Sequence, residues 1–194
     1  MSGIGSLNTR GSGLINIGSA SDGQVFTGTG AGLPTGFEAA AGGGKVLQVV
    51  ASTEKTDTFT TTSTSYVDVT GITVAITPAA TSSKILVLCN VNTGGKNGYP
   101  RFMQLLRDST PISIGASAGS RIRSSWGLQG GDREVNGGYL VFLDDPDTTS
   151  EVTYKIQQIN APGGGAFCNR GDDDADDNAR CRTSSSITVI EIGA

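Results

Sequence analysis

Histidine is missing altogether from the 194 residues of this sequence. Histidine is the usual general base near neutral pH and the commonest metal ligand, so its absence removes Ser-His-Asp and Cys-His catalysis and the common zinc sites. The glycine-rich stretches complete no nucleotide-binding motif, because Lys45 is not followed by Ser or Thr and Pro34 interrupts the segment after Gly28. We therefore expect no enzymatic activity, no resident metal and no cofactor.

Charged residues are also scarce, at 16% of the chain, and the net charge is −4. Proteins that bind nucleic acid normally present a basic surface, so we expect no nucleic-acid partner. No apolar run approaches the roughly 20 residues that cross a bilayer, and the first ten residues lack the apolar centre of a secretory signal. We therefore expect no membrane insertion.

Three cysteines are too few and too unevenly placed to form a closed disulfide framework. Cys89 lies in a run of apolar residues and is expected to be buried as a small hydrophobic side chain. Cys168 and Cys181 flank a polar loop and could pair if they face each other, although nothing in the composition indicates an oxidising compartment. The sequence leaves this pairing open.

Short runs of β-branched residues separated by turn signals are abundant, and residues 60–91 show them most clearly. The segment 84–91 is the most apolar, and alternation places Leu86 and Leu88 on one face. On the opposite face it places Ile85, Val87, Cys89 and Val91. We expect it to be the core strand, covered on both faces. The Thr70-Gly71 pair lies between two shorter runs and predicts a hairpin turn, because glycine tolerates positive φ.

Similar runs recur at short intervals over residues 45–194 and predict roughly nine or ten strands, with no helix. The connections are rich in Asp, Pro and Gly, which favours antiparallel pairing. We therefore predict an all-β domain over residues 45–194, an antiparallel β-sandwich or jelly roll. Aromatic residues are only 6% of the chain, so we expect burial against neighbouring subunits to supplement a small core.

Residues 1–44 differ in composition, since glycine is frequent and apolar residues are sparse. Their one apolar cluster is Leu14, Ile15 and Ile17. Such a segment cannot bury enough apolar surface to fold alone. We expect an extended, glycine-rich N-terminal arm that other chains hold in place, with residues 42–44 as a hinge.

Four stretches, in this order, resemble the C-terminal domains of bacteriophage tail-fibre and other appendage proteins of the marine-phage type. They are TSTSYVDVTGITVAITPAATSSKILVL (62–88), LLRDSTPISIG (105–115), GGYLVFLDDPDTTSEVTYKIQ (137–157) and SSSITVIEI (184–192). Residues 20–40 are similar to the linker repeats that precede such domains. The resemblance implies a non-enzymatic virion protein, usually a homotrimer, and an arm that attaches to another virion protein, here through residues 1–20. The chain length favours a short tail, neck or head fibre, assembled in the cytoplasm of the host bacterium.

The most unusual local feature is the acidic loop NRGDDDADDNAR at residues 169–180. Its five carboxylates belong to Asp172, Asp173, Asp174, Asp176 and Asp177. Clustered carboxylates can bind Ca²⁺, but the spacing does not match an EF-hand. We favour a solvated loop whose charge is balanced by Arg170, Arg180 and Arg182, with calcium binding as the weaker alternative.

Loops at one end of a sandwich are where binding residues usually collect. The candidate loops are 92–100, 130–136 and 160–180. Their residues that could face a receptor, such as a host-surface glycan, are Asn97, Tyr99, Arg133, Arg170 and Asp172.

Two alternatives remain open. In the first, the protein is a carbohydrate-binding module, and Tyr99, Trp126 and Tyr139 stack on sugar rings. Because Trp126 and Tyr139 lie in predicted strands, a place in the core or an interface suits them better. In the second, the protein is a fibre-borne polysaccharide depolymerase that uses a carboxylate pair, Asp132 with Glu134 or Asp144 with Asp145. Neighbouring residues of one strand point to opposite sides, which disfavours the second pair.

Overall fold

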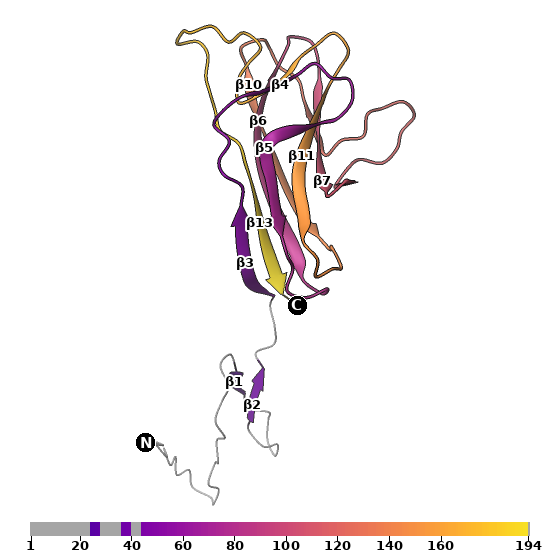
Figure 1. The fold of residues 1–194 in the computed structure, drawn as a ribbon, viewed down its shortest axis with the longest axis vertical. Coiled ribbons are helices and arrows are strands. Elements are labelled where there is room, and N and C mark those ends of the chain that lie inside the picture. The colour runs from indigo at the N-terminus through magenta and orange to yellow at the C-terminus, as the bar shows by residue number, and fades with distance from the viewer. Residues whose placement is uncertain (1–23, 28–35, 40–43, 194) are drawn as a thin grey trace, which may run out of the picture. The chain divides into compact units, whose positions relative to one another are not determined.

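The computed structural model describes residues 24–27, 36–39 and 44–193. These residues form strands and loops without any helix (Figure 1), so no helix of the described part could span a membrane. The chain divides into two compact units, Met1–Gly43 and Gly44–Ala194.

In the first unit, β1 (Gln24–Thr27) and β2 (Gly36–Ala39) pair as an antiparallel hairpin, with Phe26 opposite Phe37. We expected only extended chain here, so the hairpin is a difference from the sequence prediction. Each strand has four residues, and a two-stranded ribbon of this size is marginal in water without further packing. Leu14, Ile15, Ile17 and the rest of the predicted attachment segment 1–20 lie outside the described residues.

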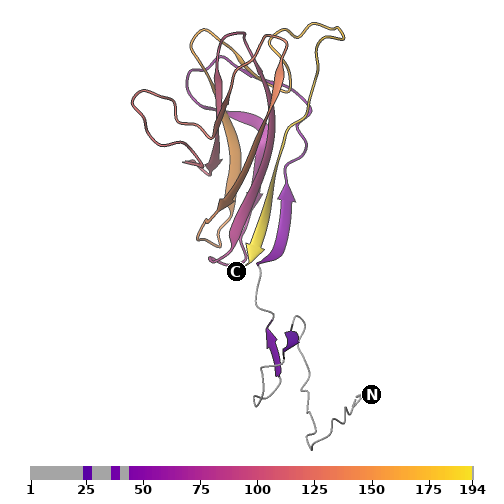
Figure 2. The same cartoon turned by 180° about the vertical axis from the view of Figure 1, so that it is seen from behind.

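The second unit is a sandwich of two antiparallel sheets, which Figures 1 and 2 show from opposite sides. Its strands are β3 (Lys45–Ala51), β4 (Phe59–Thr61), β5 (Val67–Ile76), β6 (Lys84–Gly95), β7 (Arg101–Arg107), β8 (Thr110–Ile112), β9 (Trp126–Leu128), β10 (Val135–Asp144), β11 (Val152–Asn160), β12 (Ala166–Cys168) and β13 (Ser186–Gly193).

The strand order identifies the type of sandwich. The first sheet runs β3-β13-β6-β10, and the short strands β12 and β4 extend it beside the last residues of β6. The second sheet runs β5-β11-β7, and β8 and β9 share the remaining edge of β7. We number the main strands 1 to 8 along the chain, counting β8 and β9 as one position and leaving out the short strands β4 and β12. The first sheet then has the order 1-8-3-6 and the second sheet the order 2-7-4-5. This is the arrangement of two Greek keys in a jelly roll. The predicted antiparallel all-β sandwich is confirmed, and of the two types left open by the sequence its strand order matches the jelly roll.

The core lies between the two sheets, where alternate residues of each strand point inward. From β6 it receives Ile85, Val87, Cys89 and Val91, all of them at most 5% exposed. β11 contributes Val152, Tyr154 and Ile156 from the opposite sheet, as the alternation in the sequence predicts. These side chains fix which face of each sheet remains outside.

The predicted hairpin at Thr70-Gly71 is wrong, because β5 continues through this pair from Val67 to Ile76. Its partner is β11 instead, and the pairing passes from Thr73 opposite Lys155 to Asp68 opposite Gln157, which leaves extra residues on β5 as a bulge. Gly71 lies in this bulge with a φ of 88°. The glycine in the sequence correctly indicates a residue of positive φ. Whether that residue forms a turn or a bulge depends on pairing with the distant strand β11, which produces a bulge here.

The two short strands β4 and β12 were not expected from the sequence, and β12 lies within the segment predicted to be a long loop. Each has three residues, too few for an alternating pattern to be recognised. β12 buries Cys168, whose Sγ lies 3.7 Å from the Ser185 Oγ, whereas Cys181 is exposed. Both thiols are free, so this structure contains no disulfide between them.

Candidate interaction surfaces

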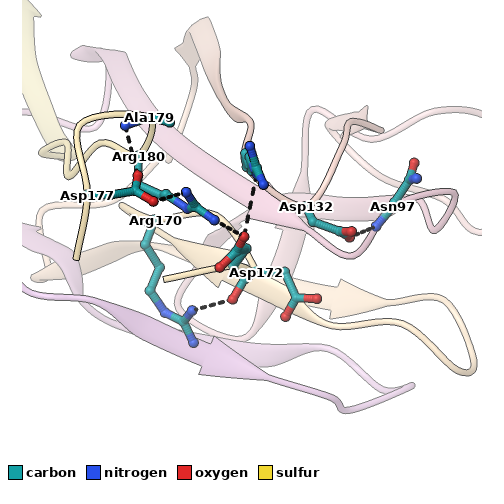
Figure 3. Close-up of polar contacts among 9 residues, drawn as sticks. Asn97, Asp132, Arg170, Asp172, Asp177, Ala179 and Arg180 are labelled. Carbon is teal, nitrogen blue, oxygen red and sulfur yellow. Dashed lines mark hydrogen bonds and ion pairs between the residues drawn. The ribbon is translucent and has the colours of Figure 1, made fainter. Parts of the chain in front are cut away.

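The three predicted binding loops meet at one end of the sandwich (Figures 1 and 3). Asp132 connects them: its carboxylate accepts a hydrogen bond from the Asn97 amide at 2.5 Å, and its carbonyl accepts one from the Asp173 amide at 2.9 Å. A further bond of 3.3 Å joins the Lys96 amide to the Gly165 carbonyl. We call residues 96–100, 130–134 and 161–182 the loop cluster.

Arginines pair with the carboxylates of the acidic loop. Arg180 contacts both Asp173 and Asp177, and Asp174 accepts a 2.6 Å hydrogen bond from Arg182. Hydrogen bonds from the Arg180 guanidinium lower the pKa of Asp173 and Asp177 below the usual range. Arg170 and Arg133 add longer ion pairs, of 3.9 Å to Asp174 and 3.5 Å to Asp173. Among the described residues no three carboxylate or thiol groups gather as a metal site.

The other residues predicted to face a receptor also lie in the loop cluster. Asn97 and Arg133 are exposed, whereas Tyr99, Arg170 and Asp172 are half-buried. The Tyr99 ring packs against the backbone of Gly163 and Gly164, where an added Cβ at Gly164 would lie 2.6 Å from the Tyr99 Cβ. The Arg170 guanidinium stacks 4.2 Å above the Phe167 ring. The cluster is therefore built from mutually packed loops, with exposed polar side chains at its rim.

The outer surface of the first sheet is a second candidate, which the sequence did not single out. Among the described residues, seven large hydrophobic side chains are exposed, and six of them lie on its two edge strands. They are Val46, Leu47 and Val49 on β3 and Tyr139, Val141 and Leu143 on β10, with exposed fractions of 47–75%.

Strand register joins Val49, Val141 and Leu143 into one surface. Leu143, Leu86, Ile190 and Val49 are successive cross-strand partners and form a row across all four strands. The neighbouring row is Val141, Leu88, Thr188 and Ala51. Directly opposed side chains on one face lie close enough to contact each other. We call the outward-facing residues Val49, Leu86, Leu88, Tyr139, Val141, Leu143 and Ile190 the apolar sheet face.

The outer surface of the second sheet is polar by comparison. Lys155 forms a 2.8 Å ion pair with Asp68, and Gln157 donates a hydrogen bond to the same carboxylate. Gln157 also accepts a 2.8 Å hydrogen bond from Gln104. An antiparallel sheet with one face in water normally alternates apolar and polar residues, and the second sheet follows this rule. The first sheet departs from it.

The aromatic residues considered for sugar stacking are separated. Trp126 is half-buried against the core, beside Gly138, whereas Tyr139 is 75% exposed on the apolar sheet face. Neither belongs to the loop cluster with Tyr99. Tyr99, Trp126 and Tyr139 therefore do not line one binding groove.

The carboxylates considered for catalysis each have protein partners. Buried Asp144 accepts hydrogen bonds from the Tyr154 hydroxyl at 2.6 Å and from Arg107 at 2.9 Å, and Asp145 pairs with Lys84 on the outside. Burial and the bond to Asp144 raise the pKa of Tyr154. The Asp132 carboxylate binds the Asn97 amide, and that of Glu134 binds the Gly131 amide at 3.0 Å.

The fold and these surfaces define an all-β jelly-roll protein with a cluster of polar loops at one end and an apolar outer sheet. Comparison with protein-family models finds none that matches the chain. Comparison with curated proteins likewise finds no match.

Proposed function

We propose that the protein is a non-enzymatic structural component of a bacteriophage particle, a short homotrimeric fibre or similar appendage of the tail, neck or head. The observation that carries this proposal is where the fibre-like stretches fall in the fold. They coincide with β5 and the first part of β6, with the β7–β8 hairpin, with β10 and β11, and with β13. The resemblance thus extends over both sheets of one jelly roll. Double-sheet jelly rolls occur in viral capsid and lectin domains, which is a fold-level analogy.

In this proposal the two units have different roles. Residues 1–20, with Leu14, Ile15 and Ile17, attach the chain to another virion protein. Residues 45–194 form the head of the appendage. No bond is made or broken, and the protein acts by assembly and by contact.

Cross-linking mass spectrometry on purified particles of the phage that encodes this chain tests the proposal. We expect the chain to be present in particles, with cross-links from residues 1–20 to a second virion protein. If the chain is abundant in infected cells but missing from purified particles, the proposal is wrong.

A second candidate, recognition of a host-surface glycan, is favoured by the joining of three loops through Asp132. Glycan arrays probed with the wild-type chain and with Asn97→Ala and Arg133→Ala variants test it, because these side chains are exposed at the rim. We expect both variants to weaken binding, whereas Thr73→Ala on the second sheet has no effect. Equal binding by all of them excludes the loop cluster. No observation favours the depolymerase alternative, which an assay for reducing ends released from host polysaccharide would detect.

A further inference from the structure

The apolar sheet face carries almost no charge. The four strands beneath it contain only Lys45, Lys84, Asp144 and Glu191 as charged residues. Asp144 and Glu191 are at most 5% exposed and point into the sandwich, and Lys84 is paired with Asp145. The centre of the face therefore has no carboxylate and no unpaired cation.

The edge strand β10 makes exposure of this surface to water unfavourable. Among the described strands β10 pairs only with β6, so within that part of the chain its other edge has no strand partner. Within its ten residues it has no Lys and no Pro, the residues that usually block edge-to-edge pairing. Instead it exposes Tyr139, Val141 and Leu143. A long, hydrophobic and unprotected edge is a site where another chain adds or packs.

The size of the face fits a subunit contact. Four strands at about 4.8 Å spacing and about eight residues of about 3.3 Å rise cover roughly 20 Å by 26 Å. A contact that covers this face with an equal area of a second copy removes about 1,000 Å² in total from water, which is the threshold expected of a biological interface.

The charge of the chain and of the apolar sheet face favours a second copy of the chain over a different protein as the partner that covers this face. Copies of a chain with a net charge of −4 repel one another, and a contact surface without carboxylates adds nothing to that repulsion. The apolar sheet face is such a surface. It also has no charge pattern with which to select a foreign partner, since specificity between different proteins commonly uses complementary charges.

We propose that the apolar sheet face is the contact between copies of this chain, with Val141 and Leu143 of one copy buried against a second copy. This inference rests on the proposed function, because it names the surface through which the homo-oligomeric appendage assembles. It also explains why Leu86 and Leu88 are apolar on the outer side of the central strand.

Sedimentation velocity of the full chain, at several protein concentrations, tests this inference. The variants are Val141→Glu and Leu143→Glu, and the matched control is Thr73→Glu, which places the same charge on an exposed strand position of the second sheet. We expect the wild type and the control to sediment as an oligomer. Both face variants should sediment as single chains, with a mass about threefold lower, because a buried unpaired carboxylate opposes association. Far-UV circular dichroism checks that every variant keeps its strands.

Amide hydrogen exchange gives a second measurement that needs no variant. We expect slower exchange over residues 135–144 in the wild-type oligomer than after dilution to single chains. If Val141→Glu and Leu143→Glu remain oligomers of wild-type mass, another surface joins the copies: the inference is wrong and the proposed appendage stands. If the wild type is a single chain at every concentration, the inference and the homotrimer both fail, while particle cross-linking still decides whether the chain is a virion protein.

Discussion

Glu191 places a carboxylate in the interior, although its strand β13 is otherwise apolar at inward positions. The side chain is 0% exposed and accepts hydrogen bonds from the Gln48 amide group at 2.6 Å and from the Ala79 backbone amide at 2.7 Å. Burial raises the pKa of Glu191, but the hydrogen bonds outweigh it, and the net pKa lies below the ordinary value. The ionised form is therefore the one the fold stabilises.

We expect Glu191→Gln to lower the free energy of unfolding at pH 7 by about 1–3 kcal/mol, because hydrogen bonds to a charged group are lost. A native pKa below the unfolded value gives stabilisation that is complete above the unfolded pKa and disappears as pH falls through the native pKa. The difference between wild type and variant should therefore shrink below about pH 4. Urea unfolding at pH 7 and at pH 3 measures it, with exposed Glu151→Gln as the control. An equal difference at both pH values would contradict the assignment.

The acidic loop yields a prediction about calcium. Asp173, Asp174 and Asp177 are already paired with arginines, so a cation would have to displace Arg180 and Arg182. We expect millimolar Ca²⁺ to leave the thermal unfolding midpoint unchanged, and EDTA to have no effect. A rise in the midpoint that Asp173→Asn abolishes would show that the loop binds the ion after all.

At the scale of the element, β5 depends on one glycine. Gly71 has a φ of 88°, in the region where a Cβ is strained. We expect Gly71→Ala to lower the free energy of unfolding by about 1–2 kcal/mol, since an L-residue with left-handed backbone costs about this much. Gly115→Ala is the matched control, because no positive φ is found there and its Cβ would meet nothing closer than 4.0 Å. Equal stability of the two variants in urea would contradict the role of Gly71 in the bulge.

The strands could be predicted because their signals are local. The inward residues of β6 and β11 follow from alternation alone. The hairpin of β7 and β8 follows from the turn residues Asp108 and Ser109, and Asp108 has a φ of 54°. The partner of β5 could not be predicted, because β11 lies far along the chain and local sequence does not encode the choice. For the same reason, the apolar sheet face could not be predicted from the sequence. Val49, Leu86, Leu143 and Ile190 come from four separate strands, and only their register brings them into one row.

The loop cluster was partly predictable. Polar segments between strands of a sandwich fall at its two ends, so the candidate loops could be named from the sequence. The hydrogen bonds of Asp132 to residues of two other loops could not, because they depend on the order of strands in both sheets. Likewise, the sequence identifies the flanking arginines as partners of the acidic loop, but the pairing of Arg180 with Asp173 and Asp177 depends on how the loop folds.

For the whole molecule, association and stability should be linked. If copies pack through the apolar sheet face, the native state gains stability from its partners by mass action. We expect the thermal midpoint of the wild type to rise with protein concentration between about 1 and 100 μM, whereas that of Val141→Glu stays constant. Differential scanning fluorimetry at a series of concentrations measures this. A constant midpoint for the wild type would mean that association adds nothing to folding.

The first and last strands of the sandwich begin and end side by side, since Lys45 is the register partner of Gly193. The start of β3 and the end of β13 lie at the end of the sandwich opposite the loop cluster (Figure 1). A cargo domain fused behind β13 would therefore emerge next to the point where the chain enters, and would leave the loops uncovered. Peptides meant for display at the tip belong in the segment between β12 and β13.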